Sequence, residues 1–504
     1  MAKFLRSDTG ILVQLGILFV AVHLATSGPY GFHRDELATL DDARHLEWGF
    51  VAYPPFTPAI GGLELALFGV STLGVRVVPI LALALVVVLS GLMARELGGS
   101  RRAQILAALT VAVVPIVTIQ TCVLQYVSFD YLWGVLLTYF LLRLLSTDDP
   151  RWWIAIGCVI GLGMMTKYTM AFFVTCLVGG MLVIGVSQRQ VRRQLFSPWL
   201  WAGVAVSLLI FLPNLIWQIQ HHFISLDFLQ HIHKRDVRQG RANGFLVQQL
   251  YVCVSAALSP LAFMGLWFYF TRGRKYLLLG CMFALTLLLF LVAQGRSYYL
   301  GPLYPVVLAA GCVVWEGWVA VRSRVLSRTI QGVTWLLIGL SAIASFALFT
   351  PIAPINSAIW NATGNIQDNF KEEIGWTDLV TTVARVYDTI PAGERSGTGI
   401  IVGNYGEAGA INLLGPQHGL PRAINGTNSN WYRSYPANQP QTLIVVGIND
   451  GFRNDHFQNC EVVAHNGNPY SVINEESRDH PDIYLCHGLR QPWPEFWQDF
   501  QWFG

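Results

Sequence analysis

The chain has 504 residues, of which 53% are hydrophobic and only 12% are charged, and its mean hydropathy is +0.45. Soluble domains carry about 25% charged residues, so the composition predicts a polytopic membrane protein. The formal net charge of +3 is too small to indicate nucleic-acid binding. The eight cysteines show no C-x-x-C spacing, which argues against a zinc ribbon or a redox motif.

The apolar stretch from Ile11 to Ala25 is not followed by a small-residue cleavage site, so we expect a retained first helix rather than a signal peptide. A membrane span needs about 20 mainly apolar residues. About eleven stretches meet this description, and the fifth and sixth abut at Lys167-Tyr168. They fall near 10–27, 73–94, 103–121, 126–145, 152–166, 168–187, 199–219, 246–270, 276–294, 299–320 and 330–350.

Every second connection between these stretches is basic, beginning with Lys3 and Arg6. The positive-inside rule then predicts a cytoplasmic N-terminus and places residues 351–504 outside. Residues 231–241 (HIHKRDVRQGR) are an exception, because they are strongly basic in a predicted outer loop.

The first predicted outer loop is about 45 residues long and has its own pattern. Residues 35–50 have helical character, Pro54-Pro55 ends them, and residues 57–68 predict an amphipathic helix on the membrane. We expect Asp41-Asp42 to face water and Glu64 to lie at the interface.

From Pro351 the chain becomes polar. Strand-like runs at Thr398–Val402 and Thr442–Val446, with helical patterns at Trp376–Tyr387 and Glu407–Leu414, predict a small α/β domain. The predicted division is a transmembrane domain over 1–350 and an extracytoplasmic domain over 351–504. Cys460 and Cys486 would then lie in an oxidising compartment, and the sequence leaves open whether they form a disulfide.

The ionisable residues close to the spans gather at the predicted outer ends. They are Asp35 and Glu36 in the first loop, Asp130, Lys167, Arg296, and the segment that carries His221, His222, His231, His233, Lys234 and Arg235. This set suits glycosyl transfer from a lipid phosphate, which needs Arg or Lys for the phosphate and a carboxylate to take the acceptor's proton. Asp35 is the candidate base, and Lys167, Arg296 and residues 231–241 are candidate phosphate binders.

Each of these residues also has a structural interpretation. Asp35 and Glu36 could be a solvated loop, Asp130 a structural hydrogen-bond partner, Lys167 a snorkelling side chain and Arg296 an interfacial anchor. The histidines could bind a divalent metal, which is the one candidate cofactor, although no H-E-x-x-H spacing is present.

Several motifs resemble the bacterial relatives of glycosyltransferase family 39, the protein-mannosyltransferase-like group that includes the aminoarabinose transferase of lipid A. They are G-F-H-R-D-E-L, A-R-H-L-E-W-G-F-V-A-Y-P-P-F-T-P, A-R-E-L-G-G, S-F-D-Y-L-W, G-L-G-M-M-T-K-Y-T-M, F-L-P-N-L-I-W-Q-I-Q-H and Y-Y-L-G-P-L-Y-P, in order over residues 10–320. A weaker likeness to an uncharacterised bacterial branch continues in E-E-I-G-W and N-Y-G-E-A-G-A.

The resemblance implies a GT-C fold, a helical membrane bundle with its active site on the outer face, and inversion at the anomeric carbon. It implies catalytic roles for Asp35, Glu36 and Asp130. The aminoarabinose transferases have a lysine where Tyr53 stands, and an arginine that Leu37-Ala38-Thr39 lacks, so their substrate is not carried over. The residues expected to bind substrate are Lys167, Arg296, His33, Arg34, Tyr53, His231, His233, Lys234, Arg235, Tyr298 and Tyr299.

The sequence thus predicts a mainly α-helical membrane glycosyltransferase. It would move a sugar from a polyprenyl-phosphate donor to a lipid or glycan acceptor on the outer face of the cytoplasmic membrane. The alternative is a transporter or flippase for an anionic lipid such as a polyprenyl phosphate, and a third interpretation is a scaffold or sensor. No internal repeat of the kind common in transporters is evident.

Overall fold

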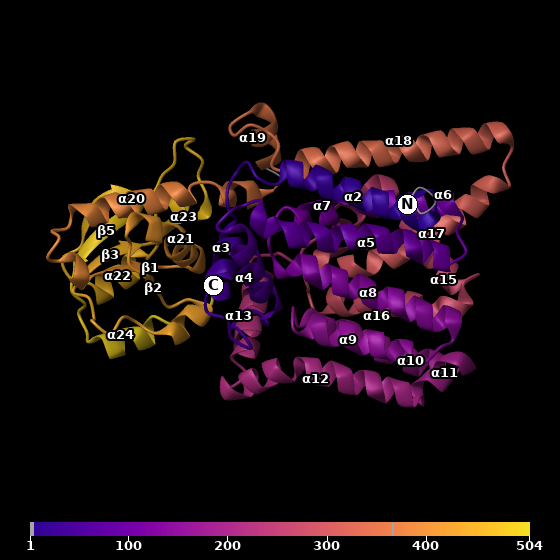
Figure 1. Cartoon of the computed structure of the whole chain (residues 1–504), viewed down its shortest axis with the longest axis horizontal. Coiled ribbons are helices and arrows are strands. Elements are labelled where there is room, and N and C mark those ends of the chain that lie inside the picture. The colour runs from indigo at the N-terminus through magenta and orange to yellow at the C-terminus, as the bar shows by residue number, and fades with distance from the viewer. Residues whose placement is uncertain (1–4, 365–366) are drawn as a thin grey trace.

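The computed structural model describes residues 5–364 and 367–504. Figure 1 shows a bundle of long, nearly parallel helices with an α/β part at one end. In the described ranges, seven helical segments are long and apolar enough to cross a membrane. They are α2 (Asp8–Thr26), Gly74–Glu96 with α5 (Val77–Glu96), α8 (Tyr126–Thr147), α12 (Pro198–Gln220), Arg274–Val292 with α16 (Leu277–Val292), Ser297–Ala320 with α17 (Tyr304–Ala320), and α18 (Arg324–Phe349).

Two of the predicted spans are bent. Helices α6 (Arg101–Ala112) and α7 (Pro115–Thr121) meet at 60°, and the proline at the start of α7 explains why the first helix does not continue. Residues Phe245–Cys253 and Ala256–Phe270, which include α15 (Ser259–Phe270), meet at 87°.

Two other predicted spans are short helices, α9 (Trp152–Met164) and α10 (Thr169–Gly185), with 13 and 17 residues. The brief turn expected between them at Lys167-Tyr168 is confirmed.

The first loop folds into two helices, α3 (Arg34–Ala43) and α4 (Phe56–Phe68). A capping box begins α3: the His33 ring accepts from a backbone N–H of the first turn, and the Glu36 carboxylate accepts from His33 N at 2.8 Å. The helix predicted over 35–50 is therefore real but ends at Ala43.

The α/β part is built on a five-stranded sheet with the order β2-β1-β3-β5-β4. Strand β1 is parallel to β2 and β3, whereas β5 is antiparallel to both β3 and β4. The strands are β1 (Thr398–Val402), β2 (Ala423–Asn425), β3 (Thr442–Val446), β4 (Glu461–His465) and β5 (Asp482–His487). The two strand-like runs of the sequence are thus confirmed with their predicted bounds.

Helices cover both faces of this sheet, which is why β1 and β3 are apolar after the threonine that begins each of them. Ile400 and Val402 belong to the core shared with α20 (Trp376–Thr389) and α21 (Tyr405–Leu414), while Ile401 packs in the cluster of α24 (Trp493–Asp499). A disulfide joins Cys460, just before β4, to Cys486 in β5, which settles the pairing that the sequence left open.

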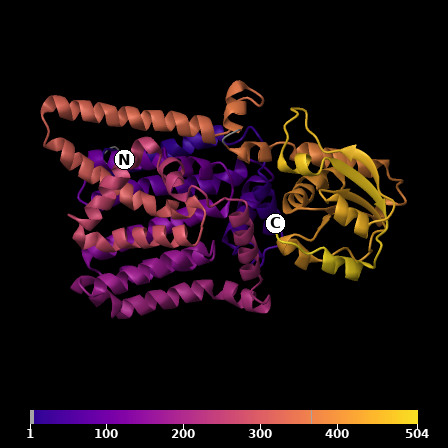
Figure 2. The same cartoon turned by 180° about the vertical axis from the view of Figure 1, so that it is seen from behind.

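Helix α13 (Ile224–Arg238) contains most of the basic 231–241 segment. Figures 1 and 2 show it at the end of the bundle beside the α/β part, running across the direction of the long helices. The remaining helices are α11 (Arg189–Leu195), α14 (Phe245–Gln248), α19 (Ala358–Gly364), α22 (Asp450–His456) and α23 (Glu475–Asp479).

Candidate active site

A cavity of about 550 Å³ lies where the bundle, α3, α13 and the α/β part meet. Its walls include residues as distant in the sequence as Arg34 and Gly504. The predicted site residues that line it are Arg34, Asp35, Tyr53, Lys167, His233, Arg235, Arg296 and Tyr299.

Asp35 occupies the first turn of α3, where the helix dipole favours a carboxylate. Its Oδ1 accepts a hydrogen bond from the Tyr405 hydroxyl at 3.1 Å, and its Oδ2 accepts one from the Gln125 amide. Burial raises the pKa of Asp35, but His33, Arg34 and these two hydrogen bonds lower it by more, so the pKa lies below its usual value. Asp35 is therefore an ionised carboxylate at neutral pH.

The other two acidic residues that line the cavity are neutralised by arginine. Asp42 is paired with Arg433, and Asp236 accepts from Arg296 Nε at 2.6 Å. Asp35 differs from both because its hydrogen bonds come from neutral donors. Among the acids in the described cavity wall, it is the one that accepts no hydrogen bond from an arginine, and its remaining lone pairs can accept a proton.

Lys167 presents a buried cation to the cavity from the turn between α9 and α10. Its Nζ lies 4.7, 5.2 and 4.4 Å from the ring centroids of Tyr126, Tyr298 and Tyr299. In the described structure this buried nitrogen has no hydrogen-bond partner. A desolvated ammonium held by aromatic rings and without an acceptor is a suitable group to bind an anion.

Three arginines surround Asp236 on the α13 side of the cavity. Arg296 is closest, and Arg241 Nη1 and Arg235 Nε lie 3.5 and 3.7 Å from Asp236 Oδ1. One carboxylate neutralises one of the three charges, so this wall keeps an excess of positive charge near Tyr299.

The remaining predicted residues do not line the cavity, although three of them contact residues that do. His33 Nδ1 accepts from Asp35 N at 3.1 Å. Asp130 is buried and accepts from Thr169 Oγ1 at 2.7 Å, and the Tyr298 ring faces Lys167. The residues outside the cavity wall are His33, Glu36, Asp130, His231, Lys234 and Tyr298.

Glu36 turns away from the cavity, in contrast to the catalytic role implied for it by the resemblance. It is fully buried and forms a two-point ion pair with Arg76, at 2.8 Å from Nε and 2.7 Å from Nη2. Leu124 N also donates to it at 2.8 Å. Successive residues of a helix point about 100° apart, so Asp35 can face the cavity while Glu36 faces the interior. Glu36 therefore holds α3 in place through its pair with Arg76.

Two expectations about the first loop are wrong. Asp41 and Asp42 do not face water, because Arg433 from the α/β part bridges them, with Nη1 2.8 Å from Asp41 Oδ2. Glu64 is not interfacial but buried, and it accepts from Val78 N at 2.8 Å.

Sequence reasoning missed Arg76, Asp236, Tyr405 and Arg433. Arg76 carried a usable signal, since it is a charge at the edge of an apolar run and therefore needs a buried partner. Tyr405 and Arg433 carried none, because their partners are more than 360 residues away along the chain.

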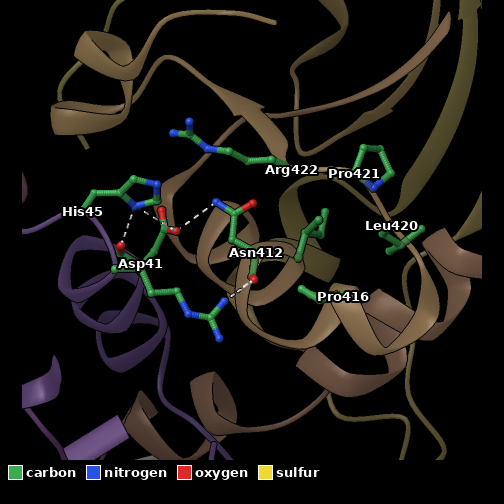
Figure 3. Close-up of a pocket in the computed structure, with 9 residues that line it drawn as sticks. Asp41, His45, Asn412, Pro416, Leu420, Pro421 and Arg422 are labelled. Carbon is green, nitrogen blue, oxygen red and sulfur yellow. Dashed lines mark hydrogen bonds and ion pairs between the residues drawn. The ribbon is translucent and has the colours of Figure 1, made fainter. Parts of the chain in front are cut away.

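A second, smaller cavity of about 210 Å³ lies between α3 and α21 (Figure 3). Asn412 is central to it: its side chain donates to Asp41 Oδ1 at 3.0 Å and its carbonyl accepts from Arg44 Nη1 at 2.6 Å. These bonds join the α/β part to the first-loop helix. Within residues 5–364 and 367–504, no group of three His, Cys, Asp or Glu residues is placed to hold a metal.

These features define the class: a multi-pass membrane protein with the GT-C fold, whose cavity lies under a structured first loop. Residues 52–217 match the family model of dolichyl-phosphate-mannose-protein mannosyltransferases. The chain is 29% identical over 311 residues to an undecaprenyl phosphate-α-4-amino-4-deoxy-L-arabinose arabinosyl transferase of Pseudomonas fluorescens, covering 58% of this chain and 54% of that protein. It is 26% identical over 263 residues to the lipopolysaccharide core galacturonosyltransferase RgtB of Rhizobium johnstonii, covering 51% and 50%.

The chain therefore spans about half the length of the curated relatives it matches. Among solved structures, it is similar to ArnT from Cupriavidus metallidurans bound to undecaprenyl phosphate, with a TM-score of 0.59 at 14% identity over 94% of this chain and 97% of that one. The mycobacterial arabinofuranosyltransferase AftD gives 0.52 at 13% identity over 95% and 40%. The predicted relationship to the aminoarabinose transferase and the GT-C fold are confirmed.

Proposed function

We propose that this protein is a membrane glycosyltransferase that takes a sugar from a polyprenyl-phosphate donor. The observation that carries the proposal is that two groups line one cavity: the Asp35 carboxylate, and the Lys167 Nζ, which has no hydrogen-bond partner among the described residues. The names of the relatives, an arabinosyl transferase that uses an undecaprenyl phosphate-linked sugar and a galacturonosyltransferase, support the same class of reaction.

In the proposed reaction, Asp35 removes the proton of an acceptor hydroxyl as its oxygen attacks the anomeric carbon. The bond between that carbon and the phosphate oxygen breaks, and the electron pair leaves with the polyprenyl phosphate. Lys167 and Arg296 stabilise the charge that grows on the phosphate, with His233 and Arg235 on the same wall. Attack opposite to the leaving group inverts the anomeric carbon.

The neighbouring residues have supporting roles in this proposal. Tyr299 and Tyr298 hold the Lys167 ammonium, and Tyr53, whose hydroxyl donates to Asp42 Oδ2 at 2.6 Å, forms the wall beside Asp35. Asp130 fixes the start of α10 next to Lys167 through Thr169. The acceptor class is a lipid or a glycan.

The proposed orientation has eleven membrane crossings: the seven long segments, the two bent pairs, and the short helices α9 and α10. The N-terminus is cytoplasmic, and residues 351–504 form the extracytoplasmic domain beyond the membrane domain 1–350. Cysteine-labelling from outside intact cells tests this, because an introduced Ser396→Cys should react and an introduced Arg328→Cys should not.

The central test is Asp35→Asn in the full chain. Loss of a general base lowers the rate about 10²- to 10⁴-fold, while binding of undecaprenyl phosphate to the purified variant should persist. Mass spectrometry of envelope lipids and glycans, from cells without the gene and with each variant, gives the readout. Asp388→Asn, at a side chain that is 67% exposed, is the matched control. Full transfer by the Asp35 variant would refute the proposal.

A further inference from the structure

The N-Y-G-E-A-G-A motif forms the start of α21 and packs against α3. A Cβ at Gly409 would lie 2.5 Å from the backbone carbonyl of Leu37, and one at Gly406 would lie 3.0 Å from Arg34 Cβ. The two glycines are three residues apart and so share one face of α21. Their missing side chains let the backbone of α21 approach the helix that carries Asp35.

The E-E-I-G-W motif makes a second junction with the first loop. Glu373 lies 3.4 Å from Arg76 Nη2, in the same buried cluster as Glu36. Its carbonyl oxygen is also 2.6 Å from where a Cβ of Gly31 would be, at a positive φ of 125° that favours glycine. The proposed reaction assigns no role to these two motifs. Both attach the α/β part to the region around the start of α3.

We propose that Tyr405, supplied by the α/β part, is a positioning residue for Asp35. This inference rests on the proposed function, since it takes Asp35 to be the base. The Tyr405 hydroxyl donates to Oδ1 at 3.1 Å while Gln125, from the bundle, donates to Oδ2. Two donors on opposite oxygens fix the rotation of the carboxylate and leave other lone pairs free for an acceptor hydroxyl.

The Asn404 side chain sets where Tyr405 stands. It accepts from Glu407 N at 2.9 Å and so caps α21, while the Glu407 carboxylate accepts from Asn404 N at 3.1 Å. Tyr405 is therefore the first residue of a doubly capped helix that is packed tightly on α3. The α/β part therefore contributes a side chain, Tyr405, to the site and does not only cover the cavity.

Removing the Tyr405 hydroxyl should raise the pKa of Asp35, because that hydrogen bond lowers it. Asp35 would then be protonated over a wider pH range. The groups that face Asp35 from its own and the neighbouring elements are His33, Arg34, Tyr53, Tyr126 and Tyr405.

The test measures modification of Asp35 in the full chain, in lipid nanodiscs, by a water-soluble carbodiimide with glycine ethyl ester. This reagent reacts with protonated carboxyl groups, and mass spectrometry of the Asp35 peptide gives the rate at each pH. For Tyr405→Phe we expect a rate about tenfold higher at pH 6 than in the wild type. Tyr470→Phe, at an exposed tyrosine of the α/β part, should leave the rate unchanged.

Gly409→Ala provides a second variant, because the added methyl would meet the Leu37 carbonyl and separate α21 from α3 while the Tyr405 hydroxyl is kept. It should also raise the rate of modification. Binding of undecaprenyl phosphate shows that each variant is folded. Unchanged rates in both variants would overturn the role of Tyr405, whereas the function proposal fails separately if Asp35→Asn still transfers sugar.

Discussion

Arg76 and Glu36 form a fully buried ion pair with two hydrogen bonds, which joins the segment Gly74–Glu96 to helix α3. Arg76 also donates to the carbonyl of Ser27 and to that of Gly31, the latter at 2.8 Å. One guanidinium thus connects the end of α2, the start of α3 and, through Glu373, the α/β part. The position of Asp35 depends on this cluster, since Asp35 precedes Glu36.

Arg76→Ala should destabilise the protein by about 3–5 kcal/mol, because it leaves the Glu36 carboxylate buried without its counter-charge. Thermal unfolding of the detergent-solubilised chain, followed by tryptophan fluorescence, measures the change. Arg478→Ala is the matched control: its side chain is 63% exposed and pairs with Asp479, so its removal should change stability by no more than about 1 kcal/mol. Equal effects in the two variants would contradict the role given to Arg76.

Lys167→Ala should weaken the binding of undecaprenyl phosphate about 10- to 100-fold, since a buried charge-assisted contact to phosphate is lost. Titration of the purified protein with the lipid measures the affinity. The control is Lys275→Ala, whose Nζ donates to Ser146 O at an exposed position. If the affinity of the Lys167 variant were unchanged, its side chain would be an interfacial anchor instead.

The sequence predicted the elements whose pattern is local. Apolar stretches predicted the helices. Thr398–Val402 and Thr442–Val446 predicted two strands with correct bounds, because strands buried on both faces are mostly apolar. It could not predict the bends within 101–121 and 245–270, since periodicity measures apolar length and not direction. It also missed that helix α3 stops at Ala43.

For the candidate site, the sequence indicated which end of the bundle holds the charges but not which charge faces the cavity. Asp35 and Glu36 are adjacent and chemically alike, and only the packing of α3 separates them. Arg433 pairs with both Asp41 and Asp42 across nearly 400 residues, and no local pattern records such a contact.

The disulfide between Cys460 and Cys486 should stabilise the α/β part by about 2–4 kcal/mol, because it closes a segment with a sequence separation of 26. The double variant Cys460→Ala with Cys486→Ala should unfold at a lower temperature. Adding a reductant should lower the unfolding temperature of the wild type and have no effect on the double variant. The buried Cys176 can be changed to Ala as a control that responds equally with and without reductant.

Stability should fall as the pH rises from about 4.5 to about 8, and Glu476 should account for part of the fall. Burial and the neighbouring Glu372 raise the pKa of Glu476 from 4.5 to about 8. The folded state therefore holds a proton that the unfolded chain releases, so the stabilisation is complete below pH 4.5 and is lost as the pH passes through 8. Glu476→Gln should flatten this dependence by at most about 1.4 kcal/mol per pH unit. Unfolding temperatures of the wild type and Glu476→Gln from pH 5 to 9 give the two slopes. Glu461→Gln, at an exposed residue, is the control. Parallel slopes for the wild type and Glu476→Gln would show that Glu476 is ionised when folded.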